Sequence, residues 1–209
     1  MLKILITGGT GRLAFELKKR LEGEYVGIEN WDFIYGVPKK DYDLVIHMGA
    51  FTDVLKAETE QEKCMMTNVM GTFNMVQAYK DTPFIYISTE WAHNPKGVYA
   101  LSKYLGEEIV RTHPRHLILR TLFKPTPWPF DFAYEDEWTQ GDYVDVIAEK
   151  LAEMAKNWDK ETSKITFLGT GRKTILELAQ RTKPDVKPNK VADYNKKIGF
   201  DLVPYDYKD

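Results

Sequence analysis

The stretch LITGGTGRLAFEL, residues 5–17, decides the fold because its glycines join a short apolar run to a helical pattern. Gly9, Gly11 and Ala14 fit the spacing G-x-G-x-x-A, and Gly8, Gly11 and Ala14 fit the looser G-x-x-G-x-x-A. Glycines let the backbone approach a pyrophosphate closely, and the first amide groups of the following helix attract its negative charge. The stretch therefore predicts a dinucleotide site at the start of an α/β protein.

The rest of the first half alternates β-branched apolar runs with helical patterns, which is typical of βαβ units and a parallel sheet. Strands are predicted at 2–7, 25–28, 44–48, 84–88 and 117–122, and helices at 11–21, 54–80 and 98–112. Residues 29–40 are too few for a helix and a crossover strand, so one βαβ unit is expected to be abbreviated.

The sequence changes character after Leu122. Residues 123–138, FKPTPWPFDFAYEDEW, contain three prolines and predict a loop region. The patterns beyond it predict a helix at 141–158, a strand at 164–169, a short helix at 173–182 and a mostly irregular tail at 183–209. We therefore divide the chain into a nucleotide-binding core, residues 1–122, and a small substrate-binding lobe packed on it, residues 123–209.

Composition narrows the class of protein. Lys and Arg number 29 against 31 Asp and Glu, giving a formal net charge of −2, which argues against a nucleic-acid partner. No apolar run approaches the ~20 residues of a membrane span, so we expect no membrane contact and a cytoplasmic location. The single cysteine, Cys64, precludes an internal disulfide, and the four histidines lack a metal-site spacing, so no metal is expected.

Glu29 stands at the end of the second predicted strand, 18 residues beyond Gly11. In dinucleotide sites an acidic residue about 20 residues after the glycine loop binds the adenosine ribose. The alternative is a solvated loop carboxylate. A carboxylate there would repel a 2′-phosphate, whereas Arg12 in the glycine loop would attract one. The sequence therefore leans weakly towards NAD over NADP.

Tyr99 and Lys103 are four residues apart in a helical pattern, so their side chains share one helix face. Thr89 ends the preceding strand, and ligands of open α/β sheets bind at such strand ends. A nearby ammonium lowers the pKa of a phenol, so Tyr99 is a candidate proton donor, with Thr89 holding the same substrate oxygen. The spacing alone is explained more simply by a packed Tyr99 and a solvated Lys103. Because the glycine loop independently predicts a dinucleotide site, the catalytic interpretation is preferred.

Six segments resemble the extended short-chain dehydrogenase/reductases in order and spacing: TGGTGRLA, DLVIHMGAFTDVLKAE, NVMGTFNM, FIYISTEWAH, YALSK and LILRT. Within that family the chain is most similar to the dTDP-4-dehydrorhamnose reductases. The resemblance covers residues 1–123 well and continues weakly through GTGRKTILELAQRTKPDVKP and the closing VPYDY. It implies a Rossmann-type fold and NAD(P)H-dependent reduction of a keto group on a nucleotide-linked deoxy sugar, as in dTDP-rhamnose and polysaccharide biosynthesis.

The resemblance also implies roles for individual residues. The catalytic set is Thr89, Tyr99 and Lys103. NAD(H) or NADP(H) would be held by Gly8, Gly11, Arg12, Leu13, Glu29, Asp32, Phe33, Ala50, Phe51, Thr52, Tyr99 and Lys103. The sugar would face Thr89, Glu90 and Phe123. Members of the family commonly form homodimers through two long helices, which here correspond to 54–80 and 98–112.

Departures from the family pattern keep alternatives open. The chain is short for the family, and the sequence STEWAH replaces the expected Asp and Tyr after the threonine. A nucleotide-sugar 4-epimerase would use the same three catalytic residues. A catalytically silent, cofactor-binding regulatory subunit would explain the short lobe, although the intact Thr89, Tyr99 and Lys103 argue against it.

Other conspicuous residues have simpler explanations. Trp128 and Trp138 are candidates for stacking on a sugar, but aromatic side chains more often form core or partner contacts. The run Glu135 to Glu137 is expected on a solvated face. His93 lies near the proposed site, yet a lone histidine is more often a surface or hydrogen-bonded residue than a catalyst.

Overall fold

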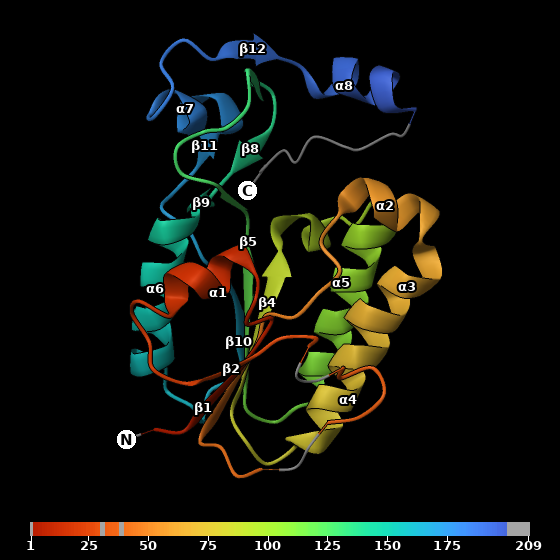
Figure 1. Ribbon diagram of the computed structural model, residues 1–209, viewed down its shortest axis with the longest axis vertical. Coiled ribbons are helices and arrows are strands. Elements are labelled where there is room, and N and C mark those ends of the chain that lie inside the picture. The colour runs from red at the N-terminus through yellow and green to blue at the C-terminus, as the bar shows by residue number, and fades with distance from the viewer. Residues whose placement is uncertain (1, 30–31, 38–39, 200–209) are drawn as a thin grey trace.

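The computed structural model describes residues 2–29, 32–37 and 40–199, and its centre is a six-stranded sheet (Figure 1). The strands lie in the order β10-β5-β4-β3-β1-β2, and each neighbouring pair is parallel. Their bounds are β1 Ile4–Thr7, β2 Glu24–Val26, β3 Leu44–His47, β4 Phe84–Thr89, β5 His116–Thr121 and β10 Lys164–Phe167. The predicted Rossmann-type α/β fold, a doubly wound parallel sheet, is confirmed.

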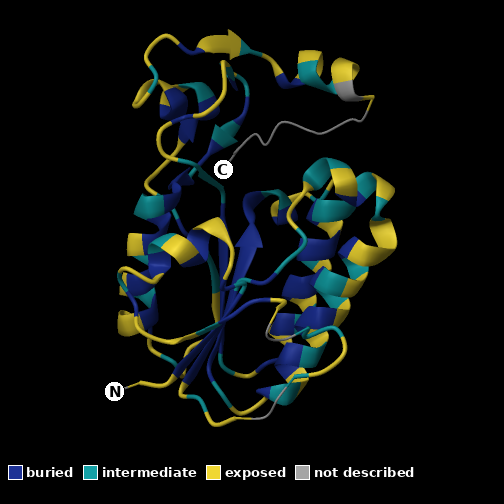
Figure 2. Ribbon diagram, in the orientation of Figure 1, coloured by how far each residue is buried: buried dark blue, intermediate teal, exposed yellow. Residues whose placement is uncertain are grey.

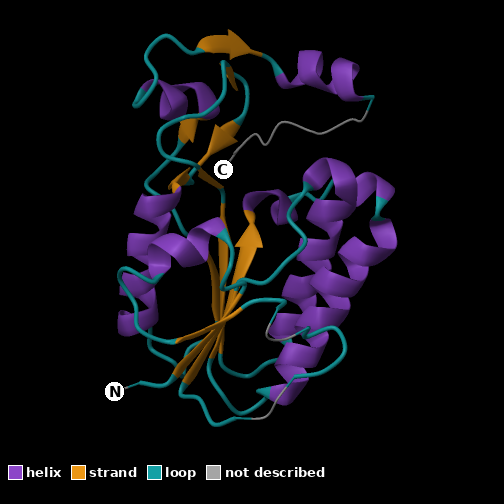
Figure 3. Ribbon diagram, viewed as in Figure 1, coloured by secondary structure: helices purple, strands orange, loops and turns teal. Residues whose placement is uncertain are grey.

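Helices cover both faces of the sheet (Figure 3). Helices α1 (Arg12–Leu17) and α6 (Val144–Asn157) pack together on one face, and α2 to α5 cover the other. The side chains of successive strand residues belong to two hydrophobic cores, one on each face of the sheet. Ile4 and Ile6 pack towards α1 and α6, whereas Leu5 packs towards α4 and α5. Because both faces are buried, the strands read as continuous apolar runs (Figure 2).

The predicted helix at 54–80 is divided in the structure. It consists of α2 (Val54–Thr59), α3 (Gln61–Met65), a π-helical turn (Met66–Met70) and α4 (Gly71–Ala78). Glu60 leaves helical geometry with φ −109° and ψ 47°, which separates α2 from α3. In the wider turn the hydroxyl of Thr72 donates to the carbonyl of Asn68 at 2.7 Å. The apolar spacing at 54–80 is that of a helix, and it does not distinguish a single π-helical turn from a continuous α-helix.

The abbreviated βαβ unit lies between β2 and β3. Among the described residues of 27–43 there is no helix or strand, and the chain returns from β2 past β1 to form β3. Strands β1 and β3 are therefore neighbours whose connections leave towards opposite faces, the position where open α/β sheets bind ligands.

The second half contributes to the sheet and also forms a small lobe. Helix α6 and strand β10 join the central layers, and α5 (Gly97–Arg111) precedes β5 on the opposite face. The lobe core combines Trp128, Tyr143, Ile175 and Leu178 with smaller side chains. The proposed division at residue 122 stays a prediction.

Two expectations for the second half are wrong. Residues 123–138 contain short strands, and the tail contains a strand and a helix. The lobe elements are β6 Phe123–Lys124, β7 Phe132–Tyr134, β8 Trp138–Thr139, β9 Asp142–Tyr143, β11 Lys173–Thr174, α7 Ile175–Gln180, β12 Lys187–Asn189 and α8 Val191–Ile198. The strands form by pairing β6 with β9, β7 with β12 and β8 with β11, and such distant partners leave no local pattern. Residues 200–209, with the segment VPYDY, lie outside the described residues.

Within the ranges described, no helix is long and apolar enough to span a membrane.

Candidate functional site

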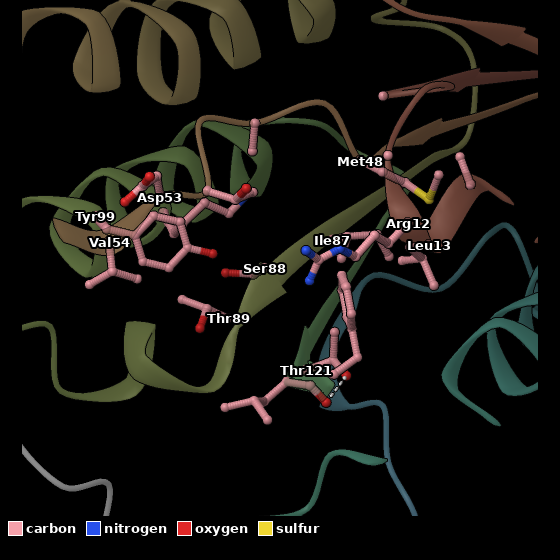
Figure 4. Close-up of a pocket in the computed structure, with 18 of the residues that line it drawn as sticks. Arg12, Leu13, Met48, Asp53, Val54, Ile87, Ser88, Thr89, Tyr99 and Thr121 are labelled. Carbon is pink, nitrogen blue, oxygen red and sulfur yellow. Dashed lines mark hydrogen bonds between the residues drawn. The ribbon is translucent and has the colours of Figure 1, made fainter. Parts of the chain in front are cut away.

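A cavity of about 630 Å³ lies over the carboxyl ends of β1, β3, β4 and β5. It brings the glycine loop together with the predicted catalytic residues (Figure 4). Of the predicted residues, it is lined by Gly8, Gly11, Arg12, Leu13, Ala50, Thr52, Thr89, Tyr99, Lys103 and Phe123. Sequence positions more than 100 residues apart thus converge on one space, as a binding site for an extended ligand requires.

The glycine loop is shaped by close backbone contacts. Gly8 has φ +73°, and a Cβ there would lie 2.9 Å from the amide nitrogen of Gly49, so no other residue fits without strain. Gly11 differs, because a Cβ there would meet only the Gly8 carbonyl at 3.2 Å and would otherwise project into open space. The amide of Gly11 donates to that carbonyl at 2.9 Å. Gly11 therefore supplies room for a phosphate, while its own amide is engaged within the loop.

Lys18 supports this loop, a role that the sequence pattern did not predict. Its ammonium donates to the carbonyl of Gly9 at 2.9 Å, and the amide of Gly9 donates to Val26 at 2.8 Å. The side chain of Arg12 extends into the cavity towards Ile87 (Figure 4). One basic side chain thus holds the loop and another faces the cavity.

Four predicted cofactor residues lie outside the cavity lining: Glu29, Asp32, Phe33 and Phe51. Glu29 is exposed, and its carboxylate folds back over Gly27 at the end of β2. The carboxylate of Asp32 accepts the amide of Ile34 at 3.0 Å, and the ring of Phe33 packs edge-on against His47 at 5.2 Å. The roles of Glu29, Asp32 and Phe33 at the adenosine end of the cofactor, and of Phe51 along it, stay predictions.

The hydroxyl of Tyr99 points towards Ser88 and Thr89 across the cavity (Figure 4). Burial raises the pKa of Tyr99 to about 12, although a hydrogen bond with Thr89 opposes that rise. The expected lowering of this pKa by Lys103 is therefore wrong. Burial is the largest influence on this phenol, and Tyr99 keeps its proton at neutral pH.

Lys103 is buried one helical turn beyond Tyr99, with 3% of its surface exposed. Its ammonium lies 4.1 Å from the centre of the Tyr86 ring. Burial lowers the pKa of Lys103 to about 7, and the carboxylate of Glu107 partly opposes that shift. The lysine can therefore change charge near neutral pH, which an exposed lysine does not do.

Glu90 has a different position from the one expected. It is 1% exposed, and its carboxylate accepts hydrogen bonds from the Thr139 hydroxyl at 2.7 Å and from the amides of Gln140 at 2.9 Å and Gly141 at 3.0 Å. Those groups belong to the lobe, and Glu90 does not line the cavity. The expectation that Glu90 faces the sugar has no support in this geometry.

Two polar residues that the sequence reasoning missed position the catalytic helix. The amide side chain of Asn68 pairs with both backbone groups of Phe51, at 2.7 and 3.0 Å, and donates to Ser102 at 2.8 Å. It thereby ties the loop after β3 to α5. The carboxylate of Glu58 accepts the amide of Val98 at 2.7 Å and so caps the start of α5. Asn68 stands out in the sequence as a polar residue of NVMGT, but its hydrogen-bond partners cannot be predicted without the fold.

A buried ion pair lies beneath the cavity. The guanidinium of Arg120 meets the carboxylate of Glu107 at 2.6 Å and 2.9 Å, and Ser88 donates to the same carboxylate at 2.6 Å. This pair joins β4, β5 and α5 below Thr89. His93 is exposed and lies 3.3 Å from the Arg120 guanidinium, in agreement with a hydrogen-bonded surface residue.

A second cavity, of about 250 Å³, opens beside the first and shares Val54 and Trp91 with it. Its walls are mostly apolar, with Lys124 and Glu137 as the charged members. The aromatic members are Trp91, Trp128, Phe130, Phe132, Tyr134 and Tyr194. We call it the aromatic cavity. Trp138 lies elsewhere and stacks on Arg172, 3.9 Å from the ring centre.

The expectation of a solvated run at Glu135 to Glu137 is wrong for its last member. Glu135 is exposed, but Glu137 is 5% exposed inside the aromatic cavity. Burial raises its pKa, and Lys124 partly opposes the shift. The backbone pairing of β8 with β11 turns Glu137 inward, which a charge run does not predict. No cluster of three or more potential metal ligands occurs among the residues that the structure describes.

Residues 2–153 match the sequence family described as RmlD substrate binding domain. A dTDP-4-dehydrorhamnose reductase of Aggregatibacter actinomycetemcomitans is 26% identical over 216 residues, which cover 87% of this chain and 68% of that enzyme. This chain spans about half the length of other curated relatives.

Solved structures share the fold. A crystal structure described as a hypothetical dTDP-4-dehydrorhamnose reductase from Sulfolobus tokodaii superposes with a TM-score of 0.75 at 24% identity, covering 91% of this chain and 86% of that chain. The dTDP-4-dehydrorhamnose reductase of Bacillus anthracis str. Ames, solved in complex with NADP, gives 0.74 at 18% identity, covering 97% and 94%.

Proposed function

Since the chain belongs to the RmlD substrate-binding-domain family, we propose that it reduces a keto group on a nucleotide-linked deoxy sugar with NADH or NADPH. The resemblance to the extended short-chain dehydrogenase/reductases is confirmed by that family match and by its reductase relatives. One observation supports the reaction most directly: a single cavity holds the glycine loop together with Thr89, Tyr99 and Lys103. The same proposal includes a cytoplasmic location, because the reduced cofactor is a cytoplasmic metabolite.

The residues of this cavity suit the chemistry. A bound reduced nicotinamide would supply the hydride, and negative charge would then develop on the keto oxygen. Tyr99, protonated at neutral pH because of its raised pKa, donates its proton to that oxygen. Thr89 donates a hydrogen bond to the same oxygen, and Lys103 adds a positive charge when it is protonated.

The aromatic cavity suits the nucleotide end of the substrate. It adjoins the catalytic cavity through Trp91, so one ligand can occupy both. Aromatic walls stack on a nucleobase, and the ammonium of Lys124 offers a partner for phosphate. Trp128, predicted as a possible stacking residue, is 5% exposed and belongs to both this wall and the lobe core.

The test is turnover by the purified chain alone. Nucleotide-linked 4-keto-6-deoxy sugars are supplied with NADH or NADPH, and loss of absorbance of the reduced cofactor is followed. We expect stoichiometric oxidation of cofactor with formation of the reduced sugar. Interconversion of sugar epimers without net cofactor oxidation would instead identify a 4-epimerase. Cofactor binding without any turnover would favour the regulatory subunit.

We also infer a homodimer formed through the helices at 54–80 and 98–112. The outward side of this helical layer exposes large apolar side chains: Met66, Met70, Phe73, Leu101 and Leu105, each between 36% and 43% exposed. We call this set the helical apolar face. Helices α4 and α5 pack side by side, so the five side chains form one surface that water disfavours. The dimerisation habit of the family supports this choice of partner.

A further inference from the structure

We propose that Glu90 is a positioning residue, which fastens the lobe to the end of β4 and so sets the substrate-binding surfaces at a fixed distance from Thr89. The catalytic part of this proposal rests on the proposed function. Thr89 is the last residue of β4, and Glu90 follows it directly in a 3-10 turn, Glu90–His93. A carboxylate fixed at this point therefore constrains the backbone that carries the Thr89 hydroxyl.

The partners of Glu90 are in the turn that joins β8 to β9. The carboxylate accepts two backbone amides of this turn, from Gln140 and Gly141, and the hydroxyl of Thr139. These donors are all uncharged. A buried carboxylate with three well-placed donors is held strongly, because each bond compensates for part of its lost hydration.

The other side of the same turn is held by backbone carbonyl contacts. The ammonium of Lys173 donates to the carbonyl of Gly141 at 2.7 Å, and the amide of Thr170 donates to that of Gln140 at 2.8 Å. The turn packs so closely that a Cβ on Gly141 would fall 2.0 Å from the Leu122 carbonyl oxygen. The turn is therefore held closely by its neighbours in the lobe and by Leu122, and the carboxylate of Glu90 links it to the end of β4.

This turn fixes residues that line both cavities. Asp142, next to Gly141, pairs with Phe123 in the β6 and β9 ladder, and Lys124 pairs with Tyr143. Phe123 lines the catalytic cavity, and Lys124 lines the aromatic cavity. A shift of the turn is thus passed to both surfaces, whereas the glycine loop, on the far side of the catalytic cavity, is untouched.

The titratable neighbours of Glu90 are Glu137 and Lys173. Burial raises the pKa of Glu90 to about 7, the three hydrogen bonds oppose that rise, and the negative charge of Glu137 adds slightly to it. The positive charge of Lys173 lies on the opposite side of the turn and is itself influenced by Glu90. The amides of Gln140 and Gly141 can donate to the Glu90 side chain whether it is ionised or protonated. These hydrogen bonds connect the lobe to β4 in either charge state.

The experiment compares Glu90→Ala, which removes the acceptor, with Glu90→Gln, which keeps one acceptor oxygen. Glu153→Ala, an exposed carboxylate on α6, serves as the matched control. Amide hydrogen exchange is measured for Gln140 and Gly141, and for Phe123 and Lys124, which needs no turnover. We expect about tenfold or faster exchange in Glu90→Ala, an intermediate rate in Glu90→Gln and the wild-type rate in the control.

Kinetics supply the second readout. In Glu90→Ala we expect kcat/KM for the nucleotide sugar to fall about tenfold or more, while the Kd for NADPH stays within about twofold. Unchanged exchange at Gln140 and Gly141 would overturn the link. Faster exchange with an unchanged kcat/KM would overturn the positioning role. A wild-type chain that turns over no nucleotide sugar would refute the proposed function alone, and the exchange rates at Phe123 and Lys124 would still decide whether Glu90 fixes these positions.

Discussion

Tyr99 is the residue on which the proposed chemistry depends. Its raised pKa keeps the proton in place until an alkoxide, a much stronger base than a phenolate, appears beside it. We expect Tyr99→Phe to lower kcat by roughly a hundredfold while the Kd for NADPH stays unchanged. Tyr104→Phe, on the same helix but outside the cavity lining, is the control and should retain wild-type turnover. Near-normal kcat in Tyr99→Phe would refute the assigned proton donor.

Lys103 predicts a pH dependence of stability. Its pKa is about 7 when folded and 10.5 in the reference state, so between these pH values the unfolded chain binds the extra proton. The contribution of Lys103 to the free energy of unfolding therefore rises as pH increases from about 7 towards 10.5, by about 1.4 kcal/mol per pH unit at most.

Urea unfolding at pH 7.5 and 9.5 measures this slope. We expect the free energy of unfolding of Lys103→Met to lack the increase with pH. Lys96, an exposed residue just before α5, provides the control, and Lys96→Met should show the same increase as the wild type. Equal slopes in the wild type and Lys103→Met would contradict the buried, weakly basic lysine.

For single residues, the sequence predicted which side chains meet at the site but not the burial and the neighbours of each side chain. The spacing of Tyr99 and Lys103 and the strand before Thr89 predicted their convergence. The direction of the Tyr99 pKa depended on burial, and the ammonium of Lys103 lies over Tyr86, which no spacing rule includes. Glu90 and Glu137 were misplaced for the same reason: their surroundings come from strands that pair across the chain.

At the scale of elements, two glycines of the loop between β1 and α1 have different roles. Gly8 is required by its positive φ and by the backbone of Gly49, whereas Gly11 faces open space. We expect Gly11→Val to remain folded and to weaken NADPH binding tenfold or more, because the branched side chain fills the space for the phosphates. Gly8→Ala should instead lower stability, by roughly 1 kcal/mol or more. Fluorescence titration and thermal unfolding check both. Wild-type cofactor affinity in folded Gly11→Val would remove the phosphate site.

Elements with a clear apolar periodicity of their own were predicted from the sequence. Elements that form only by pairing with distant segments were not. Strand β4 and helices α5 and α6 match expectation because their apolar periodicity reports the faces they bury. The two-residue strands β6, β8 and β9 exist only through their partners. Helix α8 ends at Gly199 with φ +74°, a C-terminal signal that the charged tail obscured.

For the whole molecule, the inferred dimer depends on the helical apolar face. Its five side chains lie on one side of the sheet, and Phe15, 65% exposed on α1, lies on the other. If two copies bury this face, a charge introduced on it must lose hydration without a partner. We expect the wild type to sediment as a dimer at micromolar concentration and Phe73→Glu to sediment as a monomer with an unchanged circular dichroism spectrum. Phe15→Glu introduces the same charge at an exposed phenylalanine on the opposite helical layer and should remain dimeric. A monomeric wild type, or a dimer that Phe73→Glu leaves intact while Phe15→Glu dissociates it, would show that the helices at 54–80 and 98–112 are not the interface.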